Sequence, residues 1–402
     1  MITDEVEKLK NEMVEAMKDL IPKVAISPEV GGKGESERAN FVESLLKEIG
    51  FDEIKRIDAV DHLGYKRPNI IAKIFGEHPD KTLWIIAHMD TVPEGDISLW
   101  KTDPFNAYIE NDRIYGRGTV DNGQALIGAI FAIKAIKEYG IKPPHNIGFM
   151  AVSDEEMGSK YGMKYVLDHY DFGRNDSFLI PDAGNEFGSE IEIAEKGILW
   201  FSLKVNGIQS HGSRPDLGLN AHRIGMQLAL EIDKVLHEKY NDKDELFTPP
   251  FSTFEPTKKE KNVSNINTVP GTDIIYFDTR ILPKYKIDDI LRDIDNIAKK
   301  YESITKAKIE ISVIQRSDPV TPTNANEKVV SDLIKILKET RNINPKLIGI
   351  GGGTVAAELR GKGYPAVVWA TLDEVEHSPN EYCKISNMVS DAKVFALIYL
   401  KF

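Results

Sequence analysis

Short apolar runs alternate with amphipathic stretches over about the first 190 residues and again after residue 318. Buried strands are predicted by five of these runs: NIIAKIF (69–75), TLWIIA (82–87), NIGFMAV (146–152), SFLI (177–180) and YPAVVWA (364–370). Apolar residues spaced three and four apart predict helices over 35–50, 123–140, 327–341 and 385–402. Such alternation of strands and helices is typical of a layered α/β domain.

The pattern changes between residues 192 and 317. Strands are predicted over 198–207, 266–271, 272–282 and 308–315, and helices over 220–240 and 286–304. The resulting order β-α-β-β-α-β is typical of a ferredoxin-like module. The charged run TKKEKN (257–262) is expected to be a solvated loop. The sequence therefore predicts an α/β domain formed by 1–191 and 318–402, interrupted by an inserted α+β module at 192–317.

Composition narrows the classes of partner. The net charge of −12 disfavours nucleic acid or an anionic membrane surface, but it is compatible with a cationic ligand. The single cysteine, Cys383, excludes an intramolecular disulfide and a thiolate metal cluster, which agrees with the cytoplasm. The N-terminus has an amphipathic helix pattern without the apolar region of a signal peptide, and no membrane span is expected.

Acidic and histidine residues follow the predicted strands. TLWIIA runs into His88 and Asp90, NIGFMAV into Asp154-Glu155-Glu156, SFLI into Asp182, and YPAVVWA into a loop that ends at His377. Asp121 lies between the first two runs, in the glycine-rich stretch GRGTVDNG. Ligands bind beyond the carboxyl ends of the strands in an open α/β sheet. If these strands are parallel, all of these side chains meet at one rim.

Imidazole and carboxylate groups at one rim favour divalent zinc or cobalt. One ion would hardly use so many anionic ligands, whereas two ions that share a bridging carboxylate would. In the Asp-Glu-Glu stretch, one carboxylate would then bind an ion, and its neighbour would stay free to accept a proton from water. The alternative is that these acids form the first turn of a helix, where they suit the helix dipole.

Nine motifs of the chain resemble, in the same order, those of the co-catalytic zinc peptidases and deacylases. They cover almost the whole chain: HMDTVP (88–93), GRGTVDNG (116–123), SDEEMGS (153–159), PDAG (181–184), SHGSRPDLGLNA (210–221), NTVPG (267–271), DTRILP (278–283), GGGT (351–354) and EHSPNEY (376–382). That family includes acetylornithine deacetylase, succinyl-diaminopimelate desuccinylase, aminoacylase and glutamate carboxypeptidase. The resemblance implies a zinc-peptidase-like α/β catalytic domain with an inserted ferredoxin-like lid and dimerisation domain.

The resemblance also implies two divalent metal ions, Zn²⁺ or alternatively Co²⁺ or Mn²⁺. One ion would be held by His88, Asp121 and Asp182, and the other by Asp121, Glu156 and His377. Asp90 would orient the His88 ring, as carboxylates behind metal ligands do. Glu155 would be the general base that activates a metal-bridging water. A cis peptide bond is expected after the bridging residue, between Asp121 and Asn122.

Further residues are implied on the substrate side. His211 would reach the active site of the other protomer and stabilise the oxyanion there, so that the active form is a homodimer. The substrate carboxylate or peptide terminus would be bound by Arg280, Asn267, Gly352, Gly353 and Thr354. Plainer alternatives are that His211 is a turn residue, that Arg280 forms a surface salt bridge, and that the glycines only make a turn.

The predicted function is hydrolysis of the amide bond of an N-acyl amino acid or small peptide by a dinuclear metal-dependent enzyme. Asp182 stands where the desuccinylases and glutamate carboxypeptidase usually have Glu, which makes desuccinylation a weaker assignment. Dipeptidase or aminopeptidase specificity is one alternative, and a non-catalytic metal-binding relative is another; Glu155 argues against the latter. A nucleotide-dependent enzyme is disfavoured, because no loop with phosphate-binding spacing follows a predicted strand.

Overall fold

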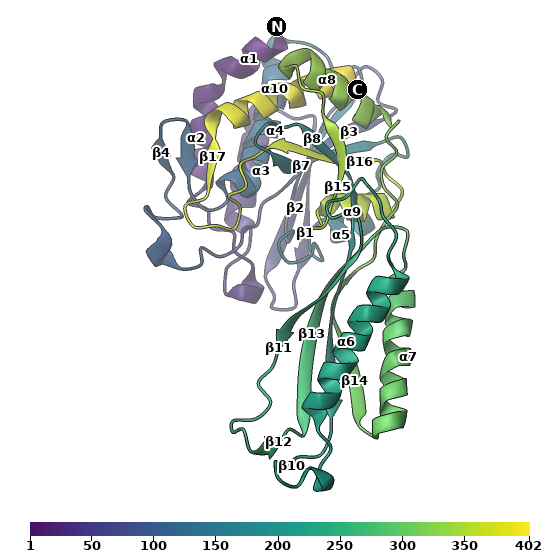
Figure 1. The fold of residues 1–402 in the computed structure, drawn as a ribbon. Helices are drawn as coiled ribbons and strands as arrows, with labels where there is room; N and C mark the ends of the chain where they lie inside the picture. Colours follow the sequence, from purple (N-terminus) through teal and green to yellow (C-terminus); the bar gives the residue numbers. More distant parts are fainter. The chain divides into compact units, whose positions relative to one another are not determined.

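The computed structural model describes residues 1–402 and consists of two compact units. Unit 1 comprises Met1–Ile193, Thr323–Ile348 and Thr354–Phe402 (Figure 1). Unit 2 comprises Ala194–Pro322 together with the short segment Gly349–Gly353. The inserted stretch therefore begins and ends a few residues later than the predicted 192–317. The sequence pattern contained no sign that a glycine-rich segment near residue 350 belongs to unit 2.

Unit 1 is built on an eight-stranded sheet of order β1-β2-β6-β3-β7-β16-β8-β15. Its strands are β1 (Glu53–Val60), β2 (Lys66–Ile74), β3 (Thr82–His88), β6 (Asn146–Val152), β7 (Ser177–Asn185), β8 (Glu190–Glu195), β15 (Lys346–Ile350) and β16 (Ala366–Thr371). The neighbours β6, β3, β7 and β16 are parallel, whereas β2 and β8 run antiparallel to β6 and β16. The carboxyl ends of the four parallel strands therefore lie at one rim.

Helices cover both faces of this sheet. They are α1 (Ile2–Lys8), α2 (Lys10–Leu20), α3 (Ser36–Ile49), α4 (Gln124–Tyr139), α5 (Met163–His169), α8 (Lys328–Arg341), α9 (Val355–Gly361) and α10 (Ile385–Lys401). α5 and α9 pack together on one face, and α4 and α10 pack together on the other (Figure 1). Every residue of β3, β6 and β16 is buried, which explains why these strands read as continuous apolar runs.

Some elements of unit 1 were not predicted. β1 has the sequence EIKRIDAV, in which only Ala59 is buried, because it is an edge strand with little apolar surface to cover. The N-terminal helical pattern is interrupted at Leu9, which separates α1 from α2. A separate three-stranded sheet consists of β17 (Tyr382–Lys384), β5 (Arg113–Tyr115) and β4 (Tyr108–Glu110). It joins the segments that precede Asp121 and follow His377.

Unit 2 has a four-stranded sheet of order β11-β13-β9-β14, and helices pack on one face of it. Its elements are β9 (Gly197–Asn206), β10 (Ser210–His211), α6 (Ala221–Lys239), β11 (Thr253–Lys259), β12 (Thr268–Val269), β13 (Thr272–Ile281), α7 (Ile287–Thr305) and β14 (Lys308–Ser317). The order β9-α6-β11-β13-α7-β14 is ferredoxin-like, and the predicted fold class is confirmed. None of the helices in the chain combines the length and apolar character that crossing a membrane requires.

Two details of the predicted module were wrong. The second strand of the sheet is β11 rather than 266–271, of which only Thr268–Val269 forms a short strand that pairs with β10. Thr257, Lys258 and Lys259, predicted as loop, belong to β11. β11 is an edge strand whose last residues are exposed, so it carries charged side chains instead of an apolar run.

Candidate metal centre

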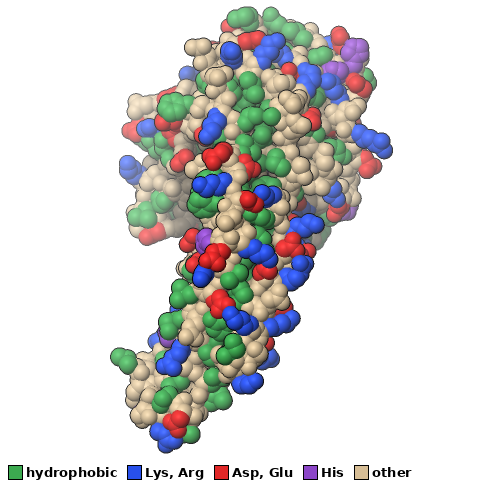
Figure 2. Space-filling view, turned by 45° about the vertical axis from the view of Figure 1, so that its right-hand side comes forward, with side chains coloured by type: hydrophobic (Ala, Val, Ile, Leu, Met, Phe, Trp, Pro, Cys, Tyr) green, Lys and Arg blue, Asp and Glu red, His purple; other side chains and the backbone are tan.

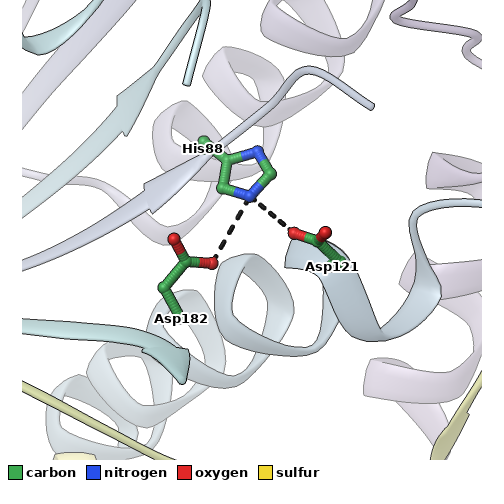
Figure 3. Close-up of side chains that lie close together, drawn as sticks. All are labelled: His88, Asp121 and Asp182. Atoms are coloured by element: carbon green, nitrogen blue, oxygen red, sulfur yellow. Dashed lines mark hydrogen bonds and ion pairs between the residues drawn. The ribbon is translucent and has the colours of Figure 1, made fainter. Parts of the chain in front are cut away.

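His88, Asp121 and Asp182 meet at the rim of the unit 1 sheet (Figure 3). His88 is the last residue of β3, Asp182 lies near the end of β7, and Asp121 lies in the irregular turn Thr119–Gly123 ahead of α4. The His88 Nε2 atom is 2.7 Å from Asp121 Oδ1 and 3.4 Å from Asp182 Oδ1. The peptide bond between Asp121 and Asn122 is cis, as the resemblance implied.

The orientation of the His88 ring is set by the main chain. Its Nδ1–H donates to the carbonyl oxygen of Asp90 at 3.0 Å, which turns Nε2 towards the two carboxylates. Burial alone lowers the pKa of His88, but the charges of Asp182 and Asp121 outweigh burial and raise this pKa well above its usual value. Two carboxylates around one buried nitrogen require a positive charge, and either a proton or a divalent cation provides it.

A second group consists of Asp121, Glu156 and His377. The His377 Nε2 atom lies 3.0 Å from Asp121 Oδ2 and 3.1 Å from Glu156 Oε2. Hydrogen bonds to Asp121 and Glu156 raise the pKa of His377 to about 10. The two oxygens of Asp121 thus face two different imidazoles, so its carboxylate belongs to both groups. Within each group the potential ligand atoms lie within 4.8 Å of one another.

Asp90 is fully buried and lies between the Glu155-Glu156 turn and the His88 ring. Its two carboxylate oxygens accept the backbone N–H groups of Glu155 and Glu156, each at 3.0 Å. The Oδ1 atom is 3.4 Å from Nδ1 of His88, so the ring is closer to the carbonyl oxygen of Asp90 than to its carboxylate. The Asp90 side chain therefore holds the Glu155-Glu156 turn more directly than it holds the ring.

The three consecutive carboxylates Asp154, Glu155 and Glu156 have different environments. Asp154 has a φ of 65°, and its carboxylate lies 3.1 Å from the buried guanidinium of Arg67, away from the two groups. Arg67 is also bound by Glu35, with Nε 2.8 Å from Oε2. The Glu155 carboxylate belongs to neither group. Burial, followed by the charge of Asp182, raises the pKa of Glu155 well above its usual range.

Several residues that support the rim were not identified from the sequence. The Asn122 amide donates to the carbonyl of Pro181 at 3.1 Å and to the Asp182 carboxylate. Glu381 is buried under the Asp121 turn and accepts the Asp121 N–H at 3.2 Å. Glu381 was within reach of sequence reasoning, since it lies in the EHSPNEY motif four residues after His377. Arg67 and Glu35 carry no such signal, because only the fold brings them beside Asp154.

The predicted substrate-side residues form two separate clusters. His211 and Asn267 lie together in unit 2, where the Gly212 N–H donates to the Asn267 carbonyl at 2.6 Å and His211 pairs with Thr268. His211 is exposed, and its Nδ1 atom is 2.8 Å from Ser213 Oγ.

Arg280 lies near the other end of β13, where it forms a bidentate pair with Asp278 at 2.7 and 3.0 Å. Its Nη1 atom donates to the Gly351 carbonyl at 2.9 Å, beside Gly352 and Gly353. Thr354 belongs to unit 1 and caps α9 by accepting the Ala356 N–H at 3.1 Å.

The donor set of the two groups fits a divalent transition metal. Two imidazole nitrogens and three carboxylates are the ligands that zinc, cobalt and manganese take in proteins. The Nδ1–H bond of His88 leaves Nε2 as the coordinating nitrogen, in the arrangement that orients metal-bound histidines generally. Each group also offers three protein ligands, the number found at catalytic zinc sites, which keep one position open.

Comparisons with known proteins agree with this assignment. Residues 84–401 match the peptidase family M20/M25/M40. An uncharacterized metallohydrolase of Methanocaldococcus jannaschii is 41% identical, over 96% of this chain and 98% of that protein. A succinyl-diaminopimelate desuccinylase of Rickettsia bellii is 27% identical, over 92% of both chains. The fold is shared with a tripeptidase of Staphylococcus aureus, with a TM-score of 0.77 at 20% identity, over 98% of both chains.

Proposed function

The chain belongs to peptidase family M20/M25/M40 and is a metal-dependent hydrolase, and from this premise we propose that it binds two divalent ions, most simply Zn²⁺, with Co²⁺ or Mn²⁺ as alternatives. His88, Asp121 and Asp182 hold one ion, and Asp121, Glu156 and His377 hold the other. The observation that carries this proposal is the position of Asp121, whose two oxygens face two different imidazoles. A single ion would leave one of these triads unused.

The proposed reaction is hydrolysis of an amide bond. When bound, the ions polarise the amide carbonyl and make water a stronger nucleophile. Glu155 accepts a proton from the attacking water and passes it to the nitrogen of the leaving amine as the C–N bond breaks. The products are a carboxylate and an amine. Glu155 suits this role because its backbone is held by Asp90, its side chain is outside both triads, and its pKa is raised.

We propose an N-acyl amino acid or a short peptide as substrate, with its carboxylate on Arg280. Asp278 and Gly351 occupy three of the five N–H donors of this side chain, so two donors remain for a substrate carboxylate. The plainer alternative is that Arg280 only braces the glycine segment 351–353. Dipeptidase or aminopeptidase specificity is the second candidate, which Asp182 favours over desuccinylation.

The geometry within unit 2 favours a homodimer as the active form. His211 and Asn267 lie just before Thr272, the first residue of β13, whereas Arg280 is close to its end. At about 3.3 Å per residue, this strand separates the two clusters by roughly 25–30 Å. One small substrate does not reach both clusters of the same chain, so if both clusters contact the substrate, a second chain supplies one of them.

The surface around His211 agrees with contact to a second chain. Ile208, Leu217 and Ile266 are large apolar residues with 58%, 62% and 105% exposure, and they lie close to His211 and Asn267 in the chain. Figure 2 shows hydrophobic side chains at its lower end, the end at which Figure 1 places β10 and β12. Burial of these side chains at a subunit interface removes apolar surface from water.

The function is tested by measuring amine release from one panel of substrates. The panel contains acetylornithine, succinyl-diaminopimelate, several N-acetyl amino acids, and di- and tripeptides with free or blocked ends. Zinc- or cobalt-loaded protein is compared with a Glu155→Gln variant loaded in the same way. Turnover of acyl substrates alone identifies a deacylase, and turnover of peptides identifies a peptidase. Two bound ions without turnover of any substrate would support the non-catalytic alternative.

A further inference from the structure

Glu381 is a buried carboxylate that accepts hydrogen bonds from Asp121 and from the residues just before it. It is fully buried, and it accepts from Arg117 Nη1 at 2.7 Å and from the backbone N–H of Gly118 at 3.0 Å. The N–H groups of Val120 and Asp121 donate to Glu381 Oε1 at 3.1 and 3.2 Å. The Glu381 carboxylate is therefore bound by four of the five residues 117–121. Arg117 donates through its side chain, and Gly118, Val120 and Asp121 donate through their main-chain N–H groups.

The turn that carries Asp121 is shaped around this carboxylate. Gly118 has a φ of +80°, a left-handed conformation that favours glycine, and a Cβ atom there would lie 2.5 Å from Thr91 Cγ2. Successive N–H groups that point to one centre form an anion-binding concavity, which is often used for phosphate. Here the protein fills the concavity with its own carboxylate. The main chain of Asp121, and with it the aim of its carboxylate, is held by Glu381.

The same residues also hold the loop that carries His377. The second terminal nitrogen of Arg117 donates to the His377 carbonyl at 3.4 Å, and the Gly116 N–H donates to the Glu381 carbonyl at 2.9 Å. Arg117 is itself buried, with its guanidinium 5.3 Å from the centre of the Trp100 ring. The Arg117–Glu381 pair thus connects two members of the Asp121–Glu156–His377 triad through their main chains.

We propose that Glu381 is a positioning residue that sets the affinity of the Asp121–Glu156–His377 triad for its ion. This inference rests on the proposed two-ion function. Glu381 does not bind the ion in this proposal, and it acts through the backbone of Asp121 and, with Arg117, through the backbone of His377. The alternative is that the pair stabilises the fold alone, without a specific effect on the metal centre.

The experiment compares Glu381→Gln with a matched control, Asp176→Asn. Glutamine has the size of glutamate, but its amide group places N–H donors against the donors of the turn. Asp176 is also buried, and its carboxylate accepts from Thr82 N–H at 2.8 Å and Trp84 Nε1 at 2.9 Å. Asp176 precedes β7 at the amino end, away from the rim, so its replacement perturbs the fold without touching either triad.

Zinc is titrated into metal-free protein in competition with a chromophoric chelator, and thermal unfolding is followed in parallel. We expect Glu381→Gln to bind one of its two ions about 10–100-fold more weakly, as is typical when a residue behind a metal ligand is lost. Asp176→Asn should melt at a lower temperature but bind both ions with unchanged affinity. Unchanged binding of both ions by folded Glu381→Gln, or equal weakening by both variants, would overturn the inference.

If Glu381→Gln does not fold, a second variant tests the same inference. Arg117→Met removes the link to the His377 carbonyl and leaves the backbone bonds of Glu381 in place, and it should also weaken one ion. Unchanged zinc binding by folded Arg117→Met would again overturn the inference. Failure of the two-ion proposal looks different, because the unmodified protein itself would then bind only one ion.

Discussion

Metal binding by this protein should release protons, because protons on the histidine rings provide the positive charge at the rim before the ions bind. Both ring nitrogens of His88 face oxygen atoms, Asp90 O at 3.0 Å and Asp121 Oδ1 at 2.7 Å, and the ring donates to both of them only as an imidazolium. The Nε2 atom of His377 faces Asp121 and Glu156, which raise the pKa of this ring to about 10. The Nε2 atom of each ring has to lose its proton before it coordinates a metal.

The number of protons released follows from the pKa shifts of these side chains. At pH 7, His88 and His377 are both protonated, so their coordination releases about one proton each. Burial in the first place, and also the charge of Asp121, raises the pKa of Glu156 to about 7, although hydrogen bonds to His377 oppose the shift. A carboxyl at its pKa is half protonated and adds about half a proton. Full loading at pH 7 should therefore release about two to three protons from these three side chains.

The assay is calorimetric titration of zinc into metal-free protein in weakly coordinating buffers with different ionisation enthalpies. The slope of the observed enthalpy against the buffer's ionisation enthalpy is the number of protons released. Since each released proton changes the overall affinity about tenfold per pH unit, affinity should rise about 100- to 1,000-fold per unit near pH 7. The dependence on His377 should disappear above its pKa of about 10, where the ring is already neutral.

Two variants show whether the protons come from the rim. His377→Ala should release about one proton fewer, because one imidazolium is missing. His145→Ala is the control, since His145 pairs with Asp80 at 3.1 Å and belongs to neither triad, and its release should equal that of the unmodified protein. Release of less than one proton by the unmodified protein would mean that both imidazoles are neutral before the metal binds. The electrostatic account of the rim would then be wrong.

Four further predictions concern single residues. Glu155→Ala should bind both ions but lose turnover, and loss of an ion on metal analysis would contradict its assignment as a base outside the triads. His211→Ala should lower the turnover rate with metal content intact, and mixing its chains with Glu155→Ala chains should restore about a quarter of the activity if the site is shared between subunits. No recovery in the mixture would argue against the shared site. Arg280→Ala should mainly weaken substrates with a free carboxylate, as judged from KM, whereas equal losses on blocked substrates would indicate a structural arginine. Arg67→Met should destabilise the fold by about 3–5 kcal/mol in urea unfolding, because it strands buried carboxylates. A loss below about 1 kcal/mol would mean that Arg67 is not needed to neutralise them.

The residues that meet at the rim could be predicted from the sequence, because most of them end or follow a predicted strand. His88 directly ends an apolar strand, and Glu156, Asp182 and His377 follow or end others, while parallel neighbours bring those ends together. The same local reasoning failed at edge strands such as β1 and β11. Their exposed residues carry charge rather than an apolar run, so the pattern does not distinguish them from loops.

Contacts between distant segments could not be predicted from local sequence patterns. The separation of Asp154 from Glu155 and Glu156 depends on Arg67, which lies in β2 and meets Asp154 only because β2 pairs with β6. The distance between His211 and Arg280 depends on the length and register of β13 in the folded sheet, whereas the motifs alone suggest that both residues approach one substrate.

The partner of each buried carboxylate separates a structural role from the proposed metal binding at this rim. Asp154 is neutralised by Arg67 and Glu381 by Arg117, and neither guanidinium gives up its proton at ordinary pH. Asp121, Glu156 and Asp182 have imidazoles as their cationic partners. An imidazolium exchanges its proton for a metal and keeps its place, because the nitrogen that held the proton becomes the ligand. A guanidinium has no such lone pair to offer. Under the proposed function, the carboxylates that bind metal are those whose partners are histidines, and this difference selects Glu156 rather than Asp154 from three adjacent acids.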